Sequence, residues 1–129
     1  MPTRKRVRPT QAELEILGVL WNRGPSTVRE VHESLDGARR VGYTTVLKLL
    51  QIMAGKGLVT RDEHERSHVY RAADPPERTR HQLVADLMER AFEGSAASLV
   101  LHALSTRRAS PEELARIREL LDRLEGGAR

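Results

Sequence analysis

Apolar residues recur every three or four positions over residues 10–24, and this spacing predicts an amphipathic helix. Thr10 and Glu13 occupy the two positions of a capping box, which marks the start of the helix. Gly24 and Pro25 mark its end. The face that we expect to be buried carries Leu14, Leu17, Gly18 and Trp21.

A second helix is predicted directly after this one. Thr27 and Glu30 form another capping box, and Asp36-Gly37 provides a suitable end. The apolar face of the second helix carries Val28, Val31 and Leu35. We therefore expect two short helices joined by a tight turn.

Residues 42–55 predict a third helix with two different faces. With about 100° of rotation per residue, one face gathers Val46, Leu49, Leu50 and Met53, with Tyr43 at its border. The opposite face carries Thr44, Lys48 and Gln51, flanked by Leu47 on one side and by Thr45 and Ile52 on the other. This outward face has no acidic residue that would repel a phosphate. Its hydroxyl, ammonium and amide groups can bond phosphates or base edges, and an exposed Leu47 can contact a thymine methyl group.

After Gly57 the helical period gives way to short β-prone segments. Residues 58–61 and 68–72 are two such segments, and a polar tip at residues 64–67 separates them. We expect a β-hairpin here, ended by the chain-breaking sequence at 74–76.

Three further helices are predicted in the rest of the chain. Residues 76–93 form the first, and residues 95–104 form a short and unusually apolar second one. Ser110 and Glu113, with a proline between them, are a strong start signal for the last. Their apolar positions include Leu83, Leu87, Met88 and Ala91 in the first, Leu99 and Leu101 in the second, and Leu114, Ile117, Leu121 and Leu124 in the last.

The order of these elements predicts a mainly α protein: a winged helix-turn-helix followed by a C-terminal three-helix dimerisation region. We place the winged helix in residues 1–74 and the helical region in residues 75–129. The helical region is too small to bury its leucine stripe alone, which favours pairing with a second copy of the chain. The alternative is that it packs back on the first half.

Composition places this fold among intracellular, helix-rich proteins. The chain has 129 residues, of which 39% are hydrophobic, 31% charged and 3% aromatic, and it has no cysteine. Disulfides and thiolate metal sites are therefore excluded. No apolar run approaches the roughly 18 residues of a membrane span, and no apolar stretch follows the basic N-terminus as in a signal peptide. We expect a cytoplasmic protein without direct membrane binding.

The positive charge is concentrated in the first half. Residues 1–74 hold 13 Lys and Arg against 9 Asp and Glu, whereas residues 75–129 hold 9 of each. This excess indicates a polyanionic partner, although a solvated basic tail would give the same count. The residues expected to clamp a nucleic-acid backbone are Arg4, Lys5 and Arg6 of an N-terminal arm and Arg61, Arg66 and Arg71 of the hairpin.

Together these features favour a protein that reads double-stranded DNA with its third helix. An ordinary solvated helix face would show similar residues, and the fold position and flanking basic segments decide against it. The alternative from another class is a winged-helix module for protein–protein interaction. A DNA reader should lose affinity steeply as salt rises, which separates the two.

Three segments resemble one known family. QAELEILGVLW, GYTTVLKLLQIM with the later KGLV, and SLVLHAL are similar to segments of the penicillinase-repressor family, also called the methicillin-resistance-repressor family, of bacterial winged-helix regulators. The resemblance covers about residues 8–125. It implies a homodimer that binds a palindromic operator and represses transcription. It also implies relief by cleavage of the C-terminal region, triggered directly or indirectly by a membrane sensor metalloprotease.

The resemblance carries the recognition-helix positions onto this chain. They are Thr44, Thr45, Leu47, Lys48 and Gln51. Leu47 and Ile52 stand where well-known members have Arg, which bears on base preference. The candidate cleavage site is His102-Ala103, which aligns with an Asn-Phe bond of the family and departs from it. The paired cysteines of the copper-responsive branch have no counterpart here.

No catalytic, metal or cofactor site is expected. His64 and His68 lie near acidic residues, but they fall across the predicted hairpin rather than on one helical face, and their spacing matches no ligand motif. No serine lies in a nucleophile elbow, and no glycine-rich phosphate loop is present. We therefore expect a protein that is not an enzyme and needs no cofactor.

Overall fold

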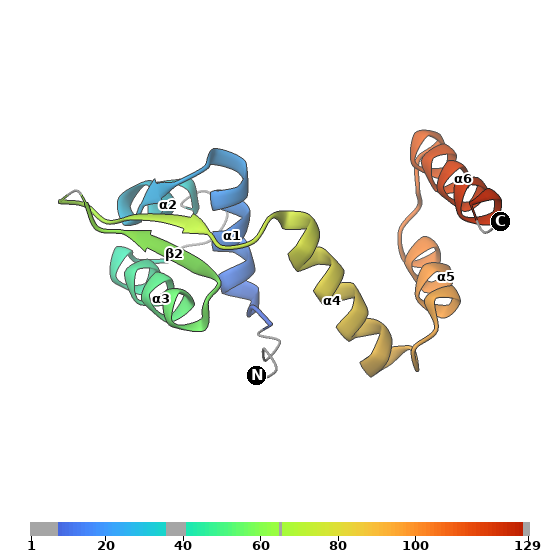
Figure 1. Cartoon of the computed structure of the whole chain (residues 1–129), viewed down its shortest axis with the longest axis horizontal. Coiled ribbons are helices and arrows are strands. Elements are labelled where there is room, and N and C mark those ends of the chain that lie inside the picture. Colours follow the sequence, from blue (N-terminus) through green and yellow to red (C-terminus); the bar gives the residue numbers. More distant parts are fainter. Residues whose placement is uncertain (1–7, 36–40, 65, 128–129) are drawn as a thin grey trace. The chain divides into compact units, whose positions relative to one another are not determined.

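The computed structural model describes residues 8–35, 41–64 and 66–127 (Figure 1). The elements occur in the order helix, short strand, two helices, two strands and three helices. They are α1 (Gln11–Arg23), β1 (Ser26–Thr27), α2 (Val28–Leu35), α3 (Tyr43–Lys56), β2 (Val59–Asp62), β3 (Val69–Ala72), α4 (Pro76–Ala91), α5 (Ala96–Thr106) and α6 (Pro111–Gly126). This order confirms the expected winged helix-turn-helix and the mainly α class.

The chain divides into two compact units, residues 1–84 and residues 85–129. The division falls inside α4, later than the boundary expected after residue 74. The early part of α4 belongs with the first unit because Thr79 is buried there. The Trp21 indole N–H also donates to the backbone oxygen of Asp74, 3.0 Å away, and so fixes the entry to α4.

The start of α1 is as expected, but its buried face is not. Thr10 and Glu13 form both bonds of the capping box. The buried residues of α1 are Glu13, Ile16, Leu17 and Leu20. Of the face expected from the sequence, Leu17 alone is buried, and Leu14, Gly18 and Trp21 are half-buried. Ile16, Leu17 and Leu20 fill the core instead, and Trp21 stays at its edge, where its indole N–H bonds to the Asp74 backbone oxygen.

The second capping box is also present: Glu30 accepts from the Thr27 N–H and the Thr27 hydroxyl accepts from the Glu30 N–H. The sequence did not predict β1, which is only two residues long and too short to show alternation. Ser26 pairs with Tyr70 and thereby makes a three-stranded antiparallel sheet in the order β1-β3-β2. The predicted hairpin is confirmed as β2 and β3.

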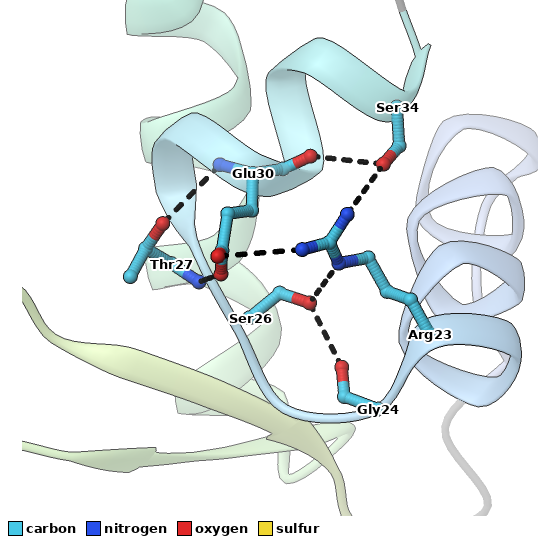
Figure 2. A network of polar contacts seen from close by, with 6 residues as sticks. All are labelled: Arg23, Gly24, Ser26, Thr27, Glu30 and Ser34. Atoms are coloured by element: carbon cyan, nitrogen blue, oxygen red, sulfur yellow. Dashed lines mark hydrogen bonds and ion pairs between the residues drawn. The ribbon is translucent and has the colours of Figure 1, made fainter.

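A network of polar contacts holds the turn between α1 and α2 (Figure 2). Arg23 donates from Nε to the Ser26 hydroxyl at 3.0 Å and pairs through Nη2 with Glu30 Oε2 at 3.3 Å. The bond from the Thr27 N–H, aided by the charge of Arg23 and opposed by partial burial, lowers the pKa of Glu30 below its ordinary value. The network therefore fixes the amino end of α2 against the end of α1.

One apolar core is shared by α1, α2, α3, β2 and β3. It consists of Ile16, Leu17, Leu20, Val28, Val31, Leu35, Val46, Leu50, Met53, Val59 and Tyr70. The expected apolar faces of α2 and α3 are confirmed, except that Leu49 is half-buried. Gly57 ends α3 in the left-handed region, with φ 84°, where a glycine carries no steric penalty.

The three C-terminal helices form as predicted, with small shifts at their ends. α4 ends at Ala91, before Glu93 and Gly94 adopt positive φ. Ser95 caps α5, and Ser110 caps α6 through the expected capping box. No residue of α5 or α6 is buried, and no helix in the described part of the chain is long and apolar enough to cross a membrane.

Candidate nucleic-acid interface

The outward face of α3 has the composition that the sequence predicts. Thr44, Thr45, Lys48 and Gln51 are all exposed. The first turn of α3 contains no acidic residue, and its N-cap, Gly42, offers no side chain to the free backbone N–H groups. The amino end of this helix is therefore electropositive and open, as binding to an anionic surface requires.

Leu47 does not belong to that exposed face. It is half-buried and packs against the core, so the expectation of an exposed leucine beside Lys48 is wrong. Leu47 lies one helical turn after Tyr43, and both side chains line a hollow between α2, α3 and β3. The Leu47 side chain packs at this hollow because part of its apolar surface is removed from water there. Ile52, in contrast, is exposed.

The three hairpin arginines differ in their surroundings. Arg61 Nη2 lies 2.6 Å from Glu63 Oε2, and hydrogen bonds to Tyr70 and Glu63 raise the pKa of Arg61. Arg66 and Arg71 are exposed, and in the described segments neither forms an ion pair. Arg66 is thus better placed than Arg61 to receive a phosphate, because its charge is not already neutralised. The arm residues Arg4, Lys5 and Arg6 lie outside the described residues.

A contact at the end of β2 joins an acid and a histidine. Asp62 Oδ1 lies 2.6 Å from His64 Nδ1 and also accepts from the His64 backbone N–H. The bond from the His64 backbone N–H, together with the side-chain bond, lowers the pKa of Asp62, and the side-chain bond raises the pKa of His64. Within the described segments no group of three His, Cys, Asp or Glu side chains is arranged to hold a metal ion.

Two basic side chains near α3, an arginine and a histidine, escaped the sequence reasoning. Arg29 follows the first residue of α2, and His68 directly precedes β3, yet both line the hollow that Leu47 and Tyr43 line. Nothing in the sequence pattern brings residues 29, 47 and 68 together, because the pairing of β1 with β3 was not predictable.

The predicted dimerisation residues lie on α4, α5 and α6. Leu83, Leu99, Leu114 and Ile117 are half-buried within a single chain, and Leu87, Leu101, Leu121 and Leu124 are exposed. His102 and Ala103 are exposed in the second half of α5. His102 Nδ1 bonds to the Ser98 backbone oxygen, and its ring lies 5.4 Å from that of Phe92.

The elements and the acid-free face of α3 define the class as winged-helix DNA-binding proteins. Comparison with known proteins supports this class and makes it specific. Residues 9–123 match the penicillinase repressor family. The chain is 36% identical to the transcriptional regulator BlaI of Mycobacterium tuberculosis, over 95% of this chain and 89% of that protein.

Two solved structures are similar to the chain at lower identity. The first is the solution structure of monomeric Bacillus licheniformis BlaI in complex with the blaP half-operator, with a TM-score of 0.48 and 22% identity over 60% of this chain and 92% of that one. The second is a MarR family protein from Bacillus stearothermophilus, with a TM-score of 0.48 and 20% identity over 92% of this chain and 74% of that one.

The chain therefore belongs to the penicillinase repressor family. Members of this family are DNA-binding transcriptional regulators and not enzymes. The family resemblance expected from the sequence is confirmed, and so is the expectation that the protein is not an enzyme.

Proposed function

We propose that this protein is a homodimeric repressor that acts in the bacterial cytoplasm and binds a palindromic operator through α3. The observation that carries the proposal is the exposed, acid-free face of Thr44, Thr45, Lys48 and Gln51 at the amino-terminal half of α3. That half of a recognition helix is the part that enters the major groove. Gln51 and Lys48 supply the side chains that can read base edges or hold a phosphate.

The dimer part of the proposal rests on the second unit. α5 and α6 contribute no buried residue in a single chain, and Leu101, Leu124 and Leu121 are 68%, 62% and 53% exposed. So much exposed leucine on short helices is costly in water and favours an apolar partner surface. A second copy of the chain offers the same surface, as a twofold interface requires.

The proposal includes relief of repression by cleavage in the C-terminal region, with a membrane sensor metalloprotease acting directly or indirectly. The bond between His102 and Ala103 lies inside α5. A protease cleaves an extended segment, so cleavage at this bond would depend on local opening of α5.

The first test measures binding to a labelled duplex from the promoter of the protein's own operon and to a random duplex of equal length. We expect tight and selective promoter binding. The logarithm of the binding constant should fall linearly with the logarithm of the salt concentration, with a slope of about −0.9 for each phosphate contacted. Equal affinity for both duplexes at physiological salt would refute operator reading. Absence of any DNA binding would favour the protein-interaction alternative.

Substitutions on α3 separate base reading from phosphate binding. Gln51→Ala is expected to reduce the preference for the promoter over random DNA by about 1–3 kcal/mol, because a bidentate contact to a base edge is lost. Lys48→Ala is expected to weaken binding to both duplexes. The measurement is fluorescence anisotropy at one salt concentration, with Gln82→Ala on the exposed surface of α4 as a control. Wild-type behaviour of both α3 variants would show that this face is not the reading face.

A further inference from the structure

The hollow beside α3 is a basic pocket built by three parts of the first unit. Its volume is about 340 Å³. Arg29 comes from α2, Tyr43 and Leu47 come from α3, and Arg66 and His68 come from the segment that leads into β3. We call this set the basic pocket. The volume is roughly ten times a water molecule's share of about 30 Å³, so the pocket has room for a phosphodiester group.

The charge of the basic pocket is unbalanced. Arg29, Arg66 and His68 are exposed, and none of them forms an ion pair with any residue that the structure describes. Within the same described segments, no acidic side chain lines the pocket. Glu30, the acid next to Arg29 in sequence, is engaged by Arg23 and by the Thr27 N–H (Figure 2). The guanidinium groups of Arg29 and Arg66 are therefore available to an external anion.

The pocket adjoins the face of α3 that we assign to DNA. Tyr43 and Leu47, which line it, are one turn apart on α3, and Thr44 and Lys48 each follow them by one residue. One residue is about 100° of rotation on a helix, so the pocket lies along the edge of the reading face. An anion held here would be at the side of any duplex that α3 enters.

We propose that the basic pocket receives one phosphate of the DNA backbone and thereby anchors the first unit on the duplex beside α3. The proposal rests on the proposed function and adds Arg29 and His68 to its contacts. Phosphate contacts fix the register of a protein on the duplex, whereas base contacts read the sequence. Arg29 is the principal ligand, because a guanidinium can bind phosphate through two parallel hydrogen bonds.

A backbone phosphate fits this pocket better than a small free anion does. The cationic side chains are exposed, so an isolated anion would remain in contact with water and lose little of its hydration. A phosphate that belongs to a duplex docked on α3 is held in place by all the other contacts of the complex. It therefore gains from the pocket without needing to be enclosed by it.

The test compares Arg29→Gln and Arg66→Gln with wild type on the promoter and random duplexes between 50 and 200 mM salt. Each substitution removes one charge from an exposed position and keeps a long side chain. We expect the salt slope to fall by about 0.9 per protomer bound for each lost phosphate contact. The affinity loss should then be about 3.5-fold larger at 50 mM than at 200 mM salt if one protomer is bound, and about 12-fold larger if two are bound. For Arg29→Gln the ratio of promoter to random affinity should stay unchanged.

The matched control is Arg80→Gln, an exposed arginine of α4 in the first unit that does not line the pocket. It should leave both the slope and the affinity as in wild type. A wild-type slope for Arg29→Gln, in a protein that still prefers its promoter, would overturn the pocket proposal and leave the proposed function standing. If the wild type itself shows no promoter preference but Arg29→Gln still reduces the salt slope, the pocket proposal is supported and operator reading is refuted.

A second arm identifies the source of the phosphate. Inorganic phosphate is titrated into the DNA-free protein and followed by calorimetry. Weak or undetectable binding is expected. Micromolar binding that Arg29→Gln abolishes, together with a wild-type DNA slope, would assign the pocket to a small anion and overturn the proposal.

Discussion

A chain that carries Leu121→Glu together with Leu124→Glu is expected to run as a monomer of 14.6 kDa instead of a dimer of twice that mass. Both leucines are more than half exposed in the single chain, so the substitutions cost little within the chain itself. In a dimer they would bury two carboxylates per protomer in an apolar interface, which is strongly unfavourable. Multi-angle light scattering measures the mass, and circular dichroism checks that the helices remain.

Loss of the proposed dimer should also weaken binding to the proposed operator greatly. Two linked half-sites bind about 10²–10⁴ times more tightly than one, because the second contact is intramolecular. The matched control is Ala115→Glu with Arg123→Gln, which changes the charge of α6 by the same amount on the side away from Leu121 and Leu124. A dimer in both the leucine variant and the control would rule out the surface of Leu121 and Leu124 as the interface.

Replacement of Lys56 by Met is expected to destabilise the first unit by about 1–3 kcal/mol, a value reduced because the lysine is partly exposed. Lys56 Nζ lies 2.9 Å and 3.1 Å from the two carboxylate oxygens of Glu13, whose side chain is 2% exposed. Without the ammonium, a carboxylate would remain buried with only its bond from the Thr10 N–H. A fall of roughly 4–8 °C in Tm per kcal/mol is expected for a unit of this size.

The acid dependence of this pair has a definite sign. Burial raises the pKa of Glu13, but the hydrogen bonds and charge of Lys56 and the bonds to Thr10 outweigh it and hold the pKa below its ordinary value of 4.5. The stability that Glu13 contributes is therefore present above pH 4.5 and is lost as the pH falls through the lowered pKa. In Lys56→Met this loss on the acid side should shrink.

Two comparison variants make the measurement decisive. Glu13→Gln should cost less than Lys56→Met, because the lysine left alone is 34% exposed and can reach water. Lys48→Met, an exposed lysine on the same helix, should change the stability by less than about 0.5 kcal/mol. Urea unfolding at pH 7 and at pH 4 gives the free energy of unfolding of wild type and of the three variants at each pH. A larger cost for Glu13→Gln than for Lys56→Met would contradict this account.

The helix starts were predictable because their signals are local. Thr10 with Glu13, Thr27 with Glu30 and Ser110 with Glu113 each satisfy backbone N–H groups within three residues, independently of the rest of the fold. The same holds for the outward face of α3, since rotation along one helix fixes which residues lie opposite its core.

The site was less predictable where it depends on several elements. Leu47 was expected on the exposed face, but its burial is decided by the hollow between α2, α3 and β3. The role of Glu13 differs in the same way. The sequence showed Glu13 as half of a capping box. Its pairing with Lys56, 43 positions later in the chain, is seen only in the folded structure.

The sequence by itself determined the order of the elements, their caps, the family and the acid-free face of α3, because caps and periodicity act over one or two helical turns. The tertiary structure decided the rotation of α1, the third strand, the Glu13–Lys56 pair and the basic pocket that joins Arg29, Leu47 and His68. Each of these depends on contacts between residues far apart in the chain. Such contacts follow from how whole helices and strands pack, which no local pattern encodes.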